Sequence, residues 1–545
     1  MLAQGVHIPE LPLRRSGIPS SLAHLPASIP AALHARARDS SNDFLVGPDF
    51  RLSFGEADEQ SLELAGRLLA LGVGKGTRLG LLFPNRPSWV VAWLAAARIG
   101  ALTVPLSTFS PGAELTHAIR HADVHGLLLT ASFGDVDLSM RLEQALPGLD
   151  RSDPELELEC SPFLRWAHVN DASPRWSARL HRSVRRAVVL DAQREVCPAD
   201  ALALISTSGA TAAPKAVIHT HGSLVRHAAL LGERSGLTSQ DRIYSPLPFF
   251  WVGGMTMVVL TALTSGAAAV VQERFEPGEA LDLVERERVT QVACWPNAAR
   301  AMADHPSFPE RDLSTVRGGS LLKALPPELR PSVGDFVSTP LGMTETGGPH
   351  TSTDDPHLPP PEPRPGTFGR PIPGMEHRVV DPETGVEIAR SDEGELLVRG
   401  AFLMSELYKQ ERHDTFTPDG WYATGDFGSF DCDGFLRFGG RMTAMIKSGG
   451  SNIAPAEVEA VLREIPGVRD AYVFGVPAGD RGDDVAAVIV QEDDASVEII
   501  ELESSARERL SSYKVPRHFR LLVEGDLPIM STGKVDLSAL RALFG

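Results

Sequence analysis

Short apolar runs alternate along this chain with segments whose apolar residues recur at the spacing of a helix. After Ser53, leucine and alanine recur at positions 62, 65, 68, 69 and 71, which marks one face of a helix. Ser53 and Glu56 form the pattern of a capping box at its start. Gly72 and Gly74 follow the last apolar position and are typical of a helix end. We therefore predict a helix that begins at Ser53 and ends before Gly72.

The same alternation recurs through much of the chain. Regular succession of strand and helix favours an α/β fold with parallel strands. Residues 255–271 are interpreted as a buried helix followed by a strand, because polar residues and Gly266 interrupt the apolar run. Strands are predicted at 79–83, 102–106, 126–129, 201–205 and 289–294, and helices at 89–99, 115–122 and 280–288.

Three regions depart from this alternation. Residues 1–40 are dotted with proline, residues 132–198 are richer in charge, and residues 353–374 are rich in proline. We predict an irregular tail, a variable excursion and a long extended loop, respectively.

A separate compact pattern follows residue 440. Helices are predicted at 455–462 and 497–510, and strands at 471–476 and 485–491. The sequence thus predicts a large N-terminal domain over residues 1–440 and a small α+β domain over residues 441–545.

Composition narrows the classes of function. The 545 residues carry a net charge of −18, which disfavours a general binder of nucleic acid or anionic membranes. The arginine-rich residues 179–186 are predicted to be solvated surface. No apolar run reaches the roughly 18–20 residues of a membrane span, and the N-terminus lacks the pattern of a secretory signal. Four widely spaced cysteines show no disulfide or metal spacing, so we expect a cytoplasmic protein with reduced thiols.

A hydroxyl-rich loop between two predicted strands carries the first candidate chemistry. Hydroxyls, backbone N–H groups and a lysine suit the phosphates of a nucleotide. The loop is not a Walker A loop, because Pro214 stands where that motif needs glycine and Ala216 where it needs serine or threonine. A polar surface turn is an equally good interpretation of the loop taken alone. The candidate ligands are Thr207, Ser208, Gly209, Thr211 and Lys215.

This loop resembles the phosphate-binding loop of the adenylate-forming superfamily. That superfamily includes acyl-CoA synthetases, peptide-synthetase adenylation domains and firefly-type luciferases, and its pattern is T-S-G-T-T-G-x-P-K-G. The loop departs from the pattern at Ala210, Ala212 and Ala216. The resemblance extends over roughly residues 45–545 and weakens at 132–198.

Residues 341–346 resemble the family segment Y-G-M-T-E. The resemblance implies that the Thr344 hydroxyl touches the α-phosphate and that the Glu345 carboxylate helps to bind Mg²⁺. Leu341 replaces the aromatic residue that stacks on adenine, and with Gly342 it would lie at the base. Taken alone, a Thr-Glu pair is more often a solvated turn.

Two more segments resemble nucleotide-binding parts of the family. Residues 420–426 resemble G-W-x-x-T-G-D, which implies that Asp426 accepts hydrogen bonds from both ribose hydroxyls. The local pattern also fits a turn that leads to a hairpin at 431–434. Residues 440–459 resemble the hinge and the segment after it, and Arg441 would there contact the nucleotide.

The last two motifs concern the thiol and the catalytic lysine. Gly449 and Gly450 permit close approach of the backbone to a thin ligand, such as the pantetheine arm of CoA. Residues 528–535 resemble the C-terminal P-x-x-x-x-G-K-[IV] loop. The resemblance implies that Lys534 bridges the substrate carboxylate and the α-phosphate.

Residues 247–255 resemble the family segment that lines the acyl pocket. Trp251 stands where the family has histidine, and aromatic residues with glycines suit a shaped apolar cavity. Ordinary core packing is the alternative. The candidate pocket residues are Phe249, Phe250, Trp251, Gly253, Gly318 and Gly319. His219 and His221 admit a metal pair or a general base, although the chemistry requires neither.

The resemblance implies an ATP-dependent acyl-CoA synthetase with a mobile C-terminal domain. Such an enzyme is an AMP-forming carboxylate–CoA ligase that uses ATP, Mg²⁺ and CoA, and the implied acid is apolar: fatty, alicyclic or aryl. An acyl-AMP ligase that loads a carrier protein in trans is an alternative. A degenerate nucleotide-binding homologue is another, suggested by Ala210, Ala212, Leu341 and Ala444. We expect no nucleic-acid partner, and the oligomeric state stays open, a homodimer included.

Overall fold

A computed structural model describes most of the chain: residues 26–36, 41–206, 215–324, 340–353, 367–442, 446–448, 451–453, 455–478, 483–492, 495, 497–510, 514–530 and 535–544. The chain divides into two compact units. The first comprises residues 1–365, 371–376 and 400–417, and the second comprises residues 366–370, 377–399 and 418–545. The predicted domain boundary at 440/441 stays a prediction.

A seven-stranded sheet forms one half of the first unit. Its central strands β9, β4, β3, β5 and β8 are parallel, as the alternating pattern predicts. β10 instead runs antiparallel to β9, and residues 207–215 connect the two strands. In order across the sheet, the strands are β21 (Glu406–Leu407), β10 (Ala216–Thr220), β9 (Ala201–Ser206), β4 (Leu102–Pro105), β3 (Arg78–Leu82), β5 (Gly126–Leu129) and β8 (Trp166–Val169).

A six-stranded sheet forms the other half of this unit. Four of its strands, β11 to β14, run parallel to their neighbours. The strand predicted at 289–294 is shorter than expected and spans only Gln291–Val292. In order, the strands are β14 (Gly318–Gly319), β13 (Gln291–Val292), β11 (Arg242–Ser245), β12 (Ala268–Val271), β1 (Asp43–Val46) and β2 (Arg51–Ser53).

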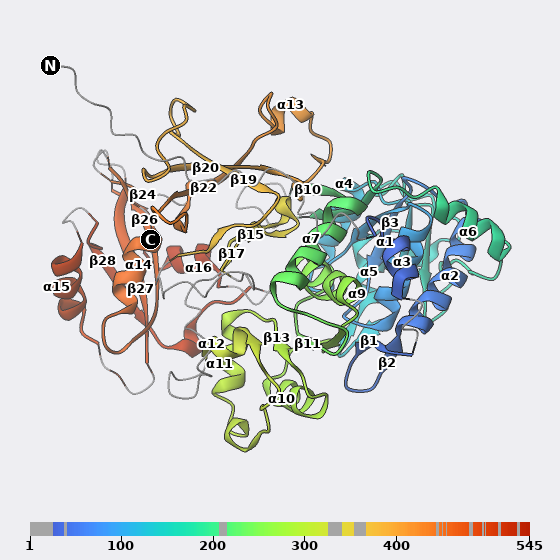
Figure 1. Ribbon diagram of the computed structural model, residues 1–545, viewed down its shortest axis with the longest axis horizontal. Helices are drawn as coiled ribbons and strands as arrows, with labels where there is room; N and C mark the ends of the chain where they lie inside the picture. The colour runs from blue at the N-terminus through green and yellow to red at the C-terminus, as the bar shows by residue number, and fades with distance from the viewer. Residues whose placement is uncertain are drawn as a thin grey trace. The chain divides into compact units, whose positions relative to one another are not determined.

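The capping box that the sequence predicts is present. The Ser53 hydroxyl accepts the Glu56 N–H at 3.2 Å, and the Glu56 carboxylate accepts the Ser53 N–H at 2.8 Å. The helix that follows is α2 (Phe54–Ala70). It lies beside α3 (Pro87–Arg98) and α6 (Arg186–Arg194) in Figure 1.

The helices predicted at 115–122 and 280–288 are present as α4 and α10, with the bounds given below. The stretch at 255–271 contains one turn of π-helix, Met255–Leu260, before a short α-helix and then β12. The remaining α-helices after α3, apart from α6, are α4 (Gly112–His121), α5 (Leu138–Ala145), α7 (His221–Arg234), α8 (Val252–Gly254), α9 (Thr261–Ser265), α10 (Pro277–Arg286), α11 (Pro296–Ala303), α12 (Ser320–Ala324) and α13 (Arg412–Thr415).

Two regions are more regular than their sequences predict. The prediction of an irregular tail is wrong for α1 (Ile29–Arg36), whose Ile29 and Leu33 are buried in the core with α2 and α3. Residues 132–198 contain β8, which completes the seven-stranded sheet. Short elements with charged flanks carry weak periodicity, and tertiary burial decides their structure. Most of the proline-rich stretch 353–374 lies outside the described residues.

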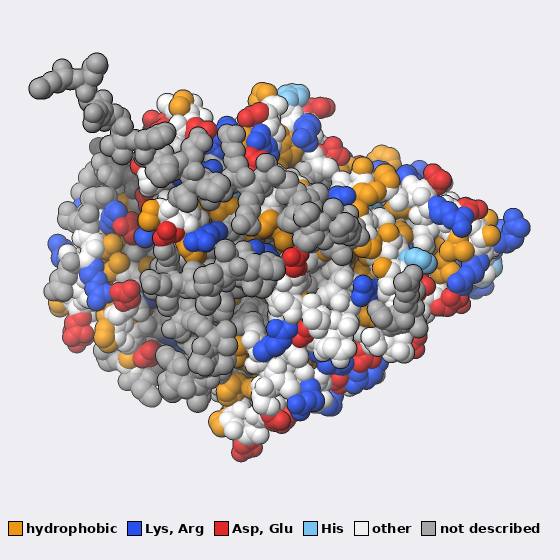
Figure 2. All heavy atoms as spheres, viewed as in Figure 1, with side chains coloured by type: hydrophobic (Ala, Val, Ile, Leu, Met, Phe, Trp, Pro, Cys, Tyr) orange, Lys and Arg blue, Asp and Glu red, His pale blue; other side chains and the backbone are white. Residues whose placement is uncertain are grey.

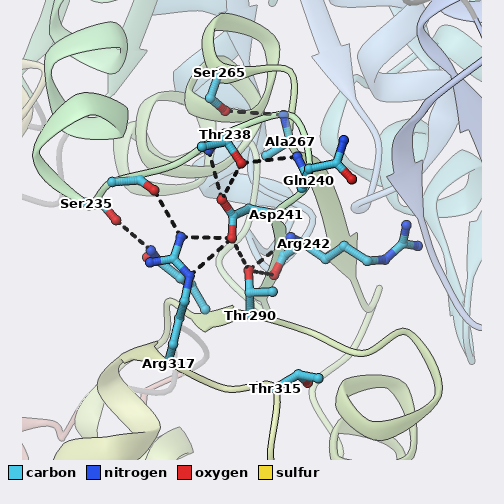
Figure 3. Close-up of polar contacts among 12 residues, drawn as sticks. Ser235, Thr238, Gln240, Asp241, Arg242, Ser265, Ala267, Thr290, Thr315 and Arg317 are labelled. Atoms are coloured by element: carbon cyan, nitrogen blue, oxygen red, sulfur yellow. Dashed lines mark hydrogen bonds and ion pairs between the residues drawn. The ribbon is translucent and has the colours of Figure 1, made fainter. Parts of the chain in front are cut away.

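A buried carboxylate ties together the amino ends of the parallel strands in the six-stranded sheet (Figure 3). Asp241, just before β11, accepts hydrogen bonds from the Thr290 hydroxyl at 2.7 Å and from Arg317 at 2.8 Å. Burial raises the pKa of Asp241, but the hydrogen bonds from Thr290 and Arg317 outweigh it and hold that pKa below its ordinary value. Arg317 directly precedes β14, so this cluster fixes the strand that carries Gly318 and Gly319.

The second unit contains a four-stranded sheet and a small α+β fold. The hairpin predicted at 431–434 joins β22 to β23. The predicted helices and strands after residue 454 are present, and β28 runs parallel to β27. The sheet comprises β19 (Met375–Val380), β20 (Gly394–Gly400), β22 (Tyr422–Phe430) and β23 (Leu436–Arg441); the later elements are β24 (Ile446–Ser448), β25 (Ser451–Ile453), α14 (Pro455–Arg463), β26 (Val468–Pro477), β27 (Asp483–Gln491), α15 (Ile499–Arg509), β28 (His518–Leu522) and α16 (Leu537–Arg541).

The described surface mixes both signs of charge. Figure 2 shows acidic and basic side chains interspersed over the visible face. The predicted solvated stretch is confirmed, because every arginine in residues 179–186 is exposed. Within the described residues, each helix is too short or too polar to cross a bilayer.

Candidate functional site

The predicted acyl-pocket segment follows the carboxyl end of a parallel strand. β11 leads into residues 247–251, and β13 leads into Trp295. In the other sheet, β4 leads toward Phe109, and β9 leads into the predicted phosphate loop. Open α/β sheets bind their ligands outside the carboxyl ends of the strands. Both sheets therefore contribute to one candidate site in the first unit.

Four aromatic rings, which we call the aromatic cluster, connect these strand ends. The cluster consists of Phe109, Phe250, Trp251 and Trp295. Trp251 lies 5.5 Å from Phe250 and 5.4 Å from Trp295, measured between ring centroids. Phe109, from the other sheet, lies 5.4 Å from Phe250. The sequence predicted Phe250 and Trp251 but missed the other two, whose only signal was their place after an apolar run.

Phe249 has different surroundings from its neighbours. It is fully buried, and its ring lies 5.3 Å from that of Trp89 in α3. This is the environment of a core residue, which the sequence left open as the alternative.

A buried asparagine anchors the pocket segment to the other sheet. The Asn85 side chain donates to the Leu247 carbonyl at 3.0 Å and accepts the Phe249 N–H at 2.9 Å. Asn85 follows β3 and is 2% exposed. Both partners lie more than 160 positions away along the chain, so no local pattern identifies this contact.

The three predicted pocket glycines differ in the space around them. A Cβ on Gly253 or Gly318 would meet only side-chain atoms, at 3.7 Å or 3.5 Å. Gly319 has a φ of +101°, and a Cβ there would overlap the carbonyl of Val292. Gly319 is thus required by the backbone, whereas the other two leave room beside the chain.

The predicted Thr344-Glu345 pair lies on a tight turn. β15 (Gly342–Met343) leads into a 3₁₀ turn, Thr344–Thr346, which ends at Gly347 with a φ of 69°. Glu345 is 8% exposed. Its carbonyl accepts the Met404 N–H at 2.7 Å. The predicted adenine neighbours, Leu341 and Gly342, directly precede the turn.

Buried histidines hold the main chain of this turn. His219 Nε2 lies 2.6 Å from the Thr344 carbonyl oxygen, and His227 Nε2 lies 2.8 Å from that of Pro349. A carbonyl only accepts, so each Nε2 carries the hydrogen. Burial lowers the pKa of each of these histidines to about 4, so both are neutral at physiological pH.

His221 faces a different element. Its Nδ1 accepts the Ile29 N–H of α1 at 3.3 Å, and burial lowers its pKa to about 4. The described residues contain no group of three His, Cys, Asp or Glu side chains arranged for a metal. His219 and His221 instead have main-chain partners on different elements, the Thr344 carbonyl and the Ile29 N–H.

Asp426 and Arg441 of the second unit form an ion pair. They lie opposite each other on β22 and β23, and Arg441 Nε is 2.8 Å from Asp426 Oδ1. Arg441 also donates to the Thr424 carbonyl at 2.8 Å. The Asp426 side chain is 3% exposed and that of Arg441 is 50% exposed. The pair holds the carboxylate in one orientation beside the left-handed Gly425.

The structure describes the lysine of the predicted phosphate loop. Lys215 is half-buried and directly precedes β10, where it closes the predicted phosphate loop. The predicted ligands that lie outside the described part of the chain are Thr207, Ser208, Gly209, Thr211, Gly449, Gly450 and Lys534.

The charges of the first unit fit nucleotide phosphates with Mg²⁺. Glu345 is a largely buried carboxylate on the same turn as the Thr344 hydroxyl. Mg²⁺ is commonly bound by one or two carboxylates together with substrate phosphates, rather than by an all-protein cage. A single buried carboxylate therefore suits a metal that is carried by the nucleotide.

Comparison with known proteins decides the family. Residues 33–408 match the family described as AMP-binding enzyme, and residues 457–534 match the AMP-binding enzyme C-terminal domain. The chain belongs to the AMP-binding enzyme family. The predicted adenylate-forming superfamily is thereby confirmed, together with the predicted α/β fold of a large and a small domain.

Relatives of this AMP-binding enzyme are acid–CoA ligases. The methyl-dioxo-octahydroindenyl-propanoyl:CoA ligase of Mycobacterium tuberculosis is 31% identical over 535 residues, which cover 95% of this chain and 99% of that one. Feruloyl-CoA synthase of an Amycolatopsis species is 30% identical over 503 residues, covering 91% and 94%. The anthranilate CoA ligase AuaEII, solved with anthranoyl-AMP, has a TM-score of 0.79 at 23% identity, with 96% and 98% covered. The predicted enzyme class, a carboxylate–CoA ligase, is confirmed at the level of the family.

Some predicted site residues of this AMP-binding enzyme lie inside the two matched ranges, and others lie between them. The aromatic cluster, Lys215, Thr344 and Glu345 fall within 33–408. Asp426 and Arg441 lie between the two matched ranges, and Lys534 is the last residue of the second.

Proposed function

We propose that the protein is an ATP-dependent acyl-CoA synthetase that activates an apolar carboxylic acid. A carboxylate oxygen of the acid attacks the α-phosphorus of ATP, the bond to pyrophosphate breaks, and an acyl adenylate forms. The sulfur of CoA then attacks the acyl carbonyl carbon, and AMP leaves. No protein nucleophile is needed, so the residues act by positioning and by neutralising charge.

The aromatic cluster is the observation that supports this substrate class. Rings from both sheets meet at the carboxyl ends of the strands, and Trp251 and Trp295 are only half-buried. Exposed aromatic faces and edges bind flat or alicyclic apolar groups well. Two relatives at 30% and 31% identity are named for ring-bearing acids, whereas relatives at 28% and 29% are named medium-chain acyl-CoA ligases. From the aromatic cluster, we expect ring-bearing acids to be better substrates than straight-chain acids.

Each predicted ligand has a stated role in this proposal. Lys215 and the hydroxyls of its loop bind phosphates, Thr344 contacts the α-phosphate, and Glu345 binds Mg²⁺. Asp426 accepts hydrogen bonds from the ribose, with Arg441 beside it. Lys534 neutralises the attacking carboxylate and the α-phosphate, and Gly449 and Gly450 receive the thiol arm of CoA.

Pyrophosphate release across a panel of fatty, aryl and alicyclic acids tests the proposal. We expect release that depends on acid and Mg²⁺, and consumption of the acyl adenylate when CoA is added. Consumption only on addition of a carrier protein would support the carrier-loading alternative instead. Absence of release across the panel, together with absence of ATP binding, would support a degenerate homologue and refute the proposal.

The role of Lys534 has its own test. We expect Lys534→Ala to abolish adenylation while sparing thioester formation from supplied acyl-AMP, because the lysine neutralises charge only in the first step. Equal loss in both half-reactions would contradict this assignment.

A further inference from the structure

His219 joins β10 to the turn that carries the two predicted phosphate and metal ligands. Its Nε2 donates to the Thr344 carbonyl at 2.6 Å, although the two residues are 125 positions apart. The side chain is fully buried. A short hydrogen bond in a fully buried site is a strong constraint on the atom that accepts it.

The same carbonyl and its neighbour are held from other directions as well. The Gly347 N–H donates to the Thr344 carbonyl at 3.0 Å, and the Met404 N–H donates to the Glu345 carbonyl at 2.7 Å. Gly347 has a left-handed φ of 69°, and a Cβ there would lie 2.8 Å from Leu224 and 3.4 Å from the His219 ring. The turn therefore packs directly on His219, with no room for an added methyl group on that side.

The direction of a peptide plane sets where the next side chain points. The Thr344 carbonyl belongs to the peptide that joins Thr344 to Glu345, so a bond to this oxygen fixes the orientation of that peptide. Thr344 is half-buried and Glu345 is buried. Rotation of this peptide would move both predicted ligands relative to bound phosphates.

We propose that His219 is a positioning residue for adenylation: through its bond to the Thr344 carbonyl, it holds the Thr344 hydroxyl and the Glu345 carboxylate in the orientation that ATP and its metal require. This inference rests on the proposed function of that turn. His219 is fully buried, so it would act through the Thr344 carbonyl and not by contact with nucleotide or acid.

His221 is the matched control. It lies two residues away, is equally buried, and likewise makes one hydrogen bond to the main chain, accepting the Ile29 N–H at 3.3 Å. Its partner is in α1, not in the turn. Loss of either histidine disturbs the core, but only loss of His219 removes a hydrogen bond from the Thr344 carbonyl, which then keeps the Gly347 N–H as its donor.

The test compares His219→Leu, His219→Gln and His221→Leu in the full-length enzyme, at the same acid and over a range of ATP and Mg²⁺ concentrations. Misplacement of a binding group by about 1 Å can lower a rate on the order of 100-fold. We expect His219→Leu to lower kcat for pyrophosphate release roughly 10- to 100-fold and to raise the Mg²⁺ concentration needed. Glutamine places an amide N–H near the position of Nε2, so His219→Gln should recover most of kcat. His221→Leu should lower the melting temperature and leave kcat unchanged.

Three outcomes would overturn the inference. These are wild-type kcat and Mg²⁺ dependence in folded His219→Leu, no recovery in His219→Gln, or an equal loss of kcat in His221→Leu. If His219→Leu does not fold, His219→Asn takes its place in the comparison. The asparagine amide reaches only the position of Nδ1, so kcat of His219→Asn must be lower than kcat of His219→Gln. If the wild type releases no pyrophosphate with any acid, the proposed function fails, and calorimetry of Mg·ATP binding to the same variants still tests the role of His219.

Discussion

Gly318 and Gly319 form β14 side by side, but the structure predicts opposite outcomes for replacing each with alanine. Gly319 has a φ of +101°, and a Cβ there would lie 2.7 Å from the carbonyl carbon of Val292, in the neighbouring strand β13. At Gly318 the nearest atom to a Cβ is in the Gln291 side chain, at 3.5 Å, which is an ordinary contact.

The magnitude follows from two separate penalties. A left-handed backbone costs a residue with a Cβ about 1–2 kcal/mol. Overlap with a neighbouring backbone that is fixed in a sheet costs typically about 1–3 kcal/mol more. We therefore expect Gly319→Ala to lower the free energy of unfolding of the first unit by about 2–5 kcal/mol. Gly318→Ala should change it by less than about 1 kcal/mol.

Urea unfolding followed by tryptophan fluorescence measures this difference. All seven tryptophans of the chain are available as probes, and several lie in the first unit around α3 and the aromatic cluster. The first unfolding transition of Gly319→Ala should shift to lower urea, while that of Gly318→Ala should overlay the wild type. Equal midpoints for the two variants would refute the reasoning, because both changes add the same methyl group to adjacent residues.

Three further predictions follow from polar contacts. Burial lowers the pKa values of His219, His221 and His227 to about 4, so their contribution to stability is complete above about pH 6.5 and falls as the pH drops toward 4. At pH 5 the loss is about 2 kcal/mol per histidine. A melting temperature that is unchanged from pH 7 to pH 5 would contradict this. Asn85→Ala leaves the Leu247 carbonyl and the Phe249 N–H without their Asn85 partner, which should lower the free energy of unfolding by about 1–3 kcal/mol. The KM for the acid should rise more than the KM for ATP. An unchanged ratio of the two KM values would argue against a role at the pocket. Asp241→Asn removes charge-assisted hydrogen bonds from Arg317 and should lower stability by about 1–3 kcal/mol at pH 7. Because the pKa of Asp241 is held below its ordinary value, this difference should shrink only as the pH falls below that ordinary value, and denaturation midpoints that stay equally far apart on acidification would contradict the reasoning.

Local patterns of the sequence determined the elements and the family. The capping box at Ser53 and Glu56, the alternation of strands and helices, and the hairpin at 431–434 depend on neighbours within a few residues, so the chain encodes them locally. The motif spacings also predicted the adenylate-forming superfamily before any fold was known. Short elements were less predictable: α1 and β8 are stabilised by burial in cores formed by distant segments.

Only the tertiary structure decided which residues meet. Phe109 joins Phe250 and Trp251 because the carboxyl ends of two sheets face one cluster, and no local pattern encodes that approach. By its sequence alone His219 fits a metal ligand or a general base, but the fold gives it, like Asn85, a main-chain partner more than 100 residues away. A sequence specifies the chemistry that each side chain carries, and packing over long separations specifies the atom on which that chemistry acts.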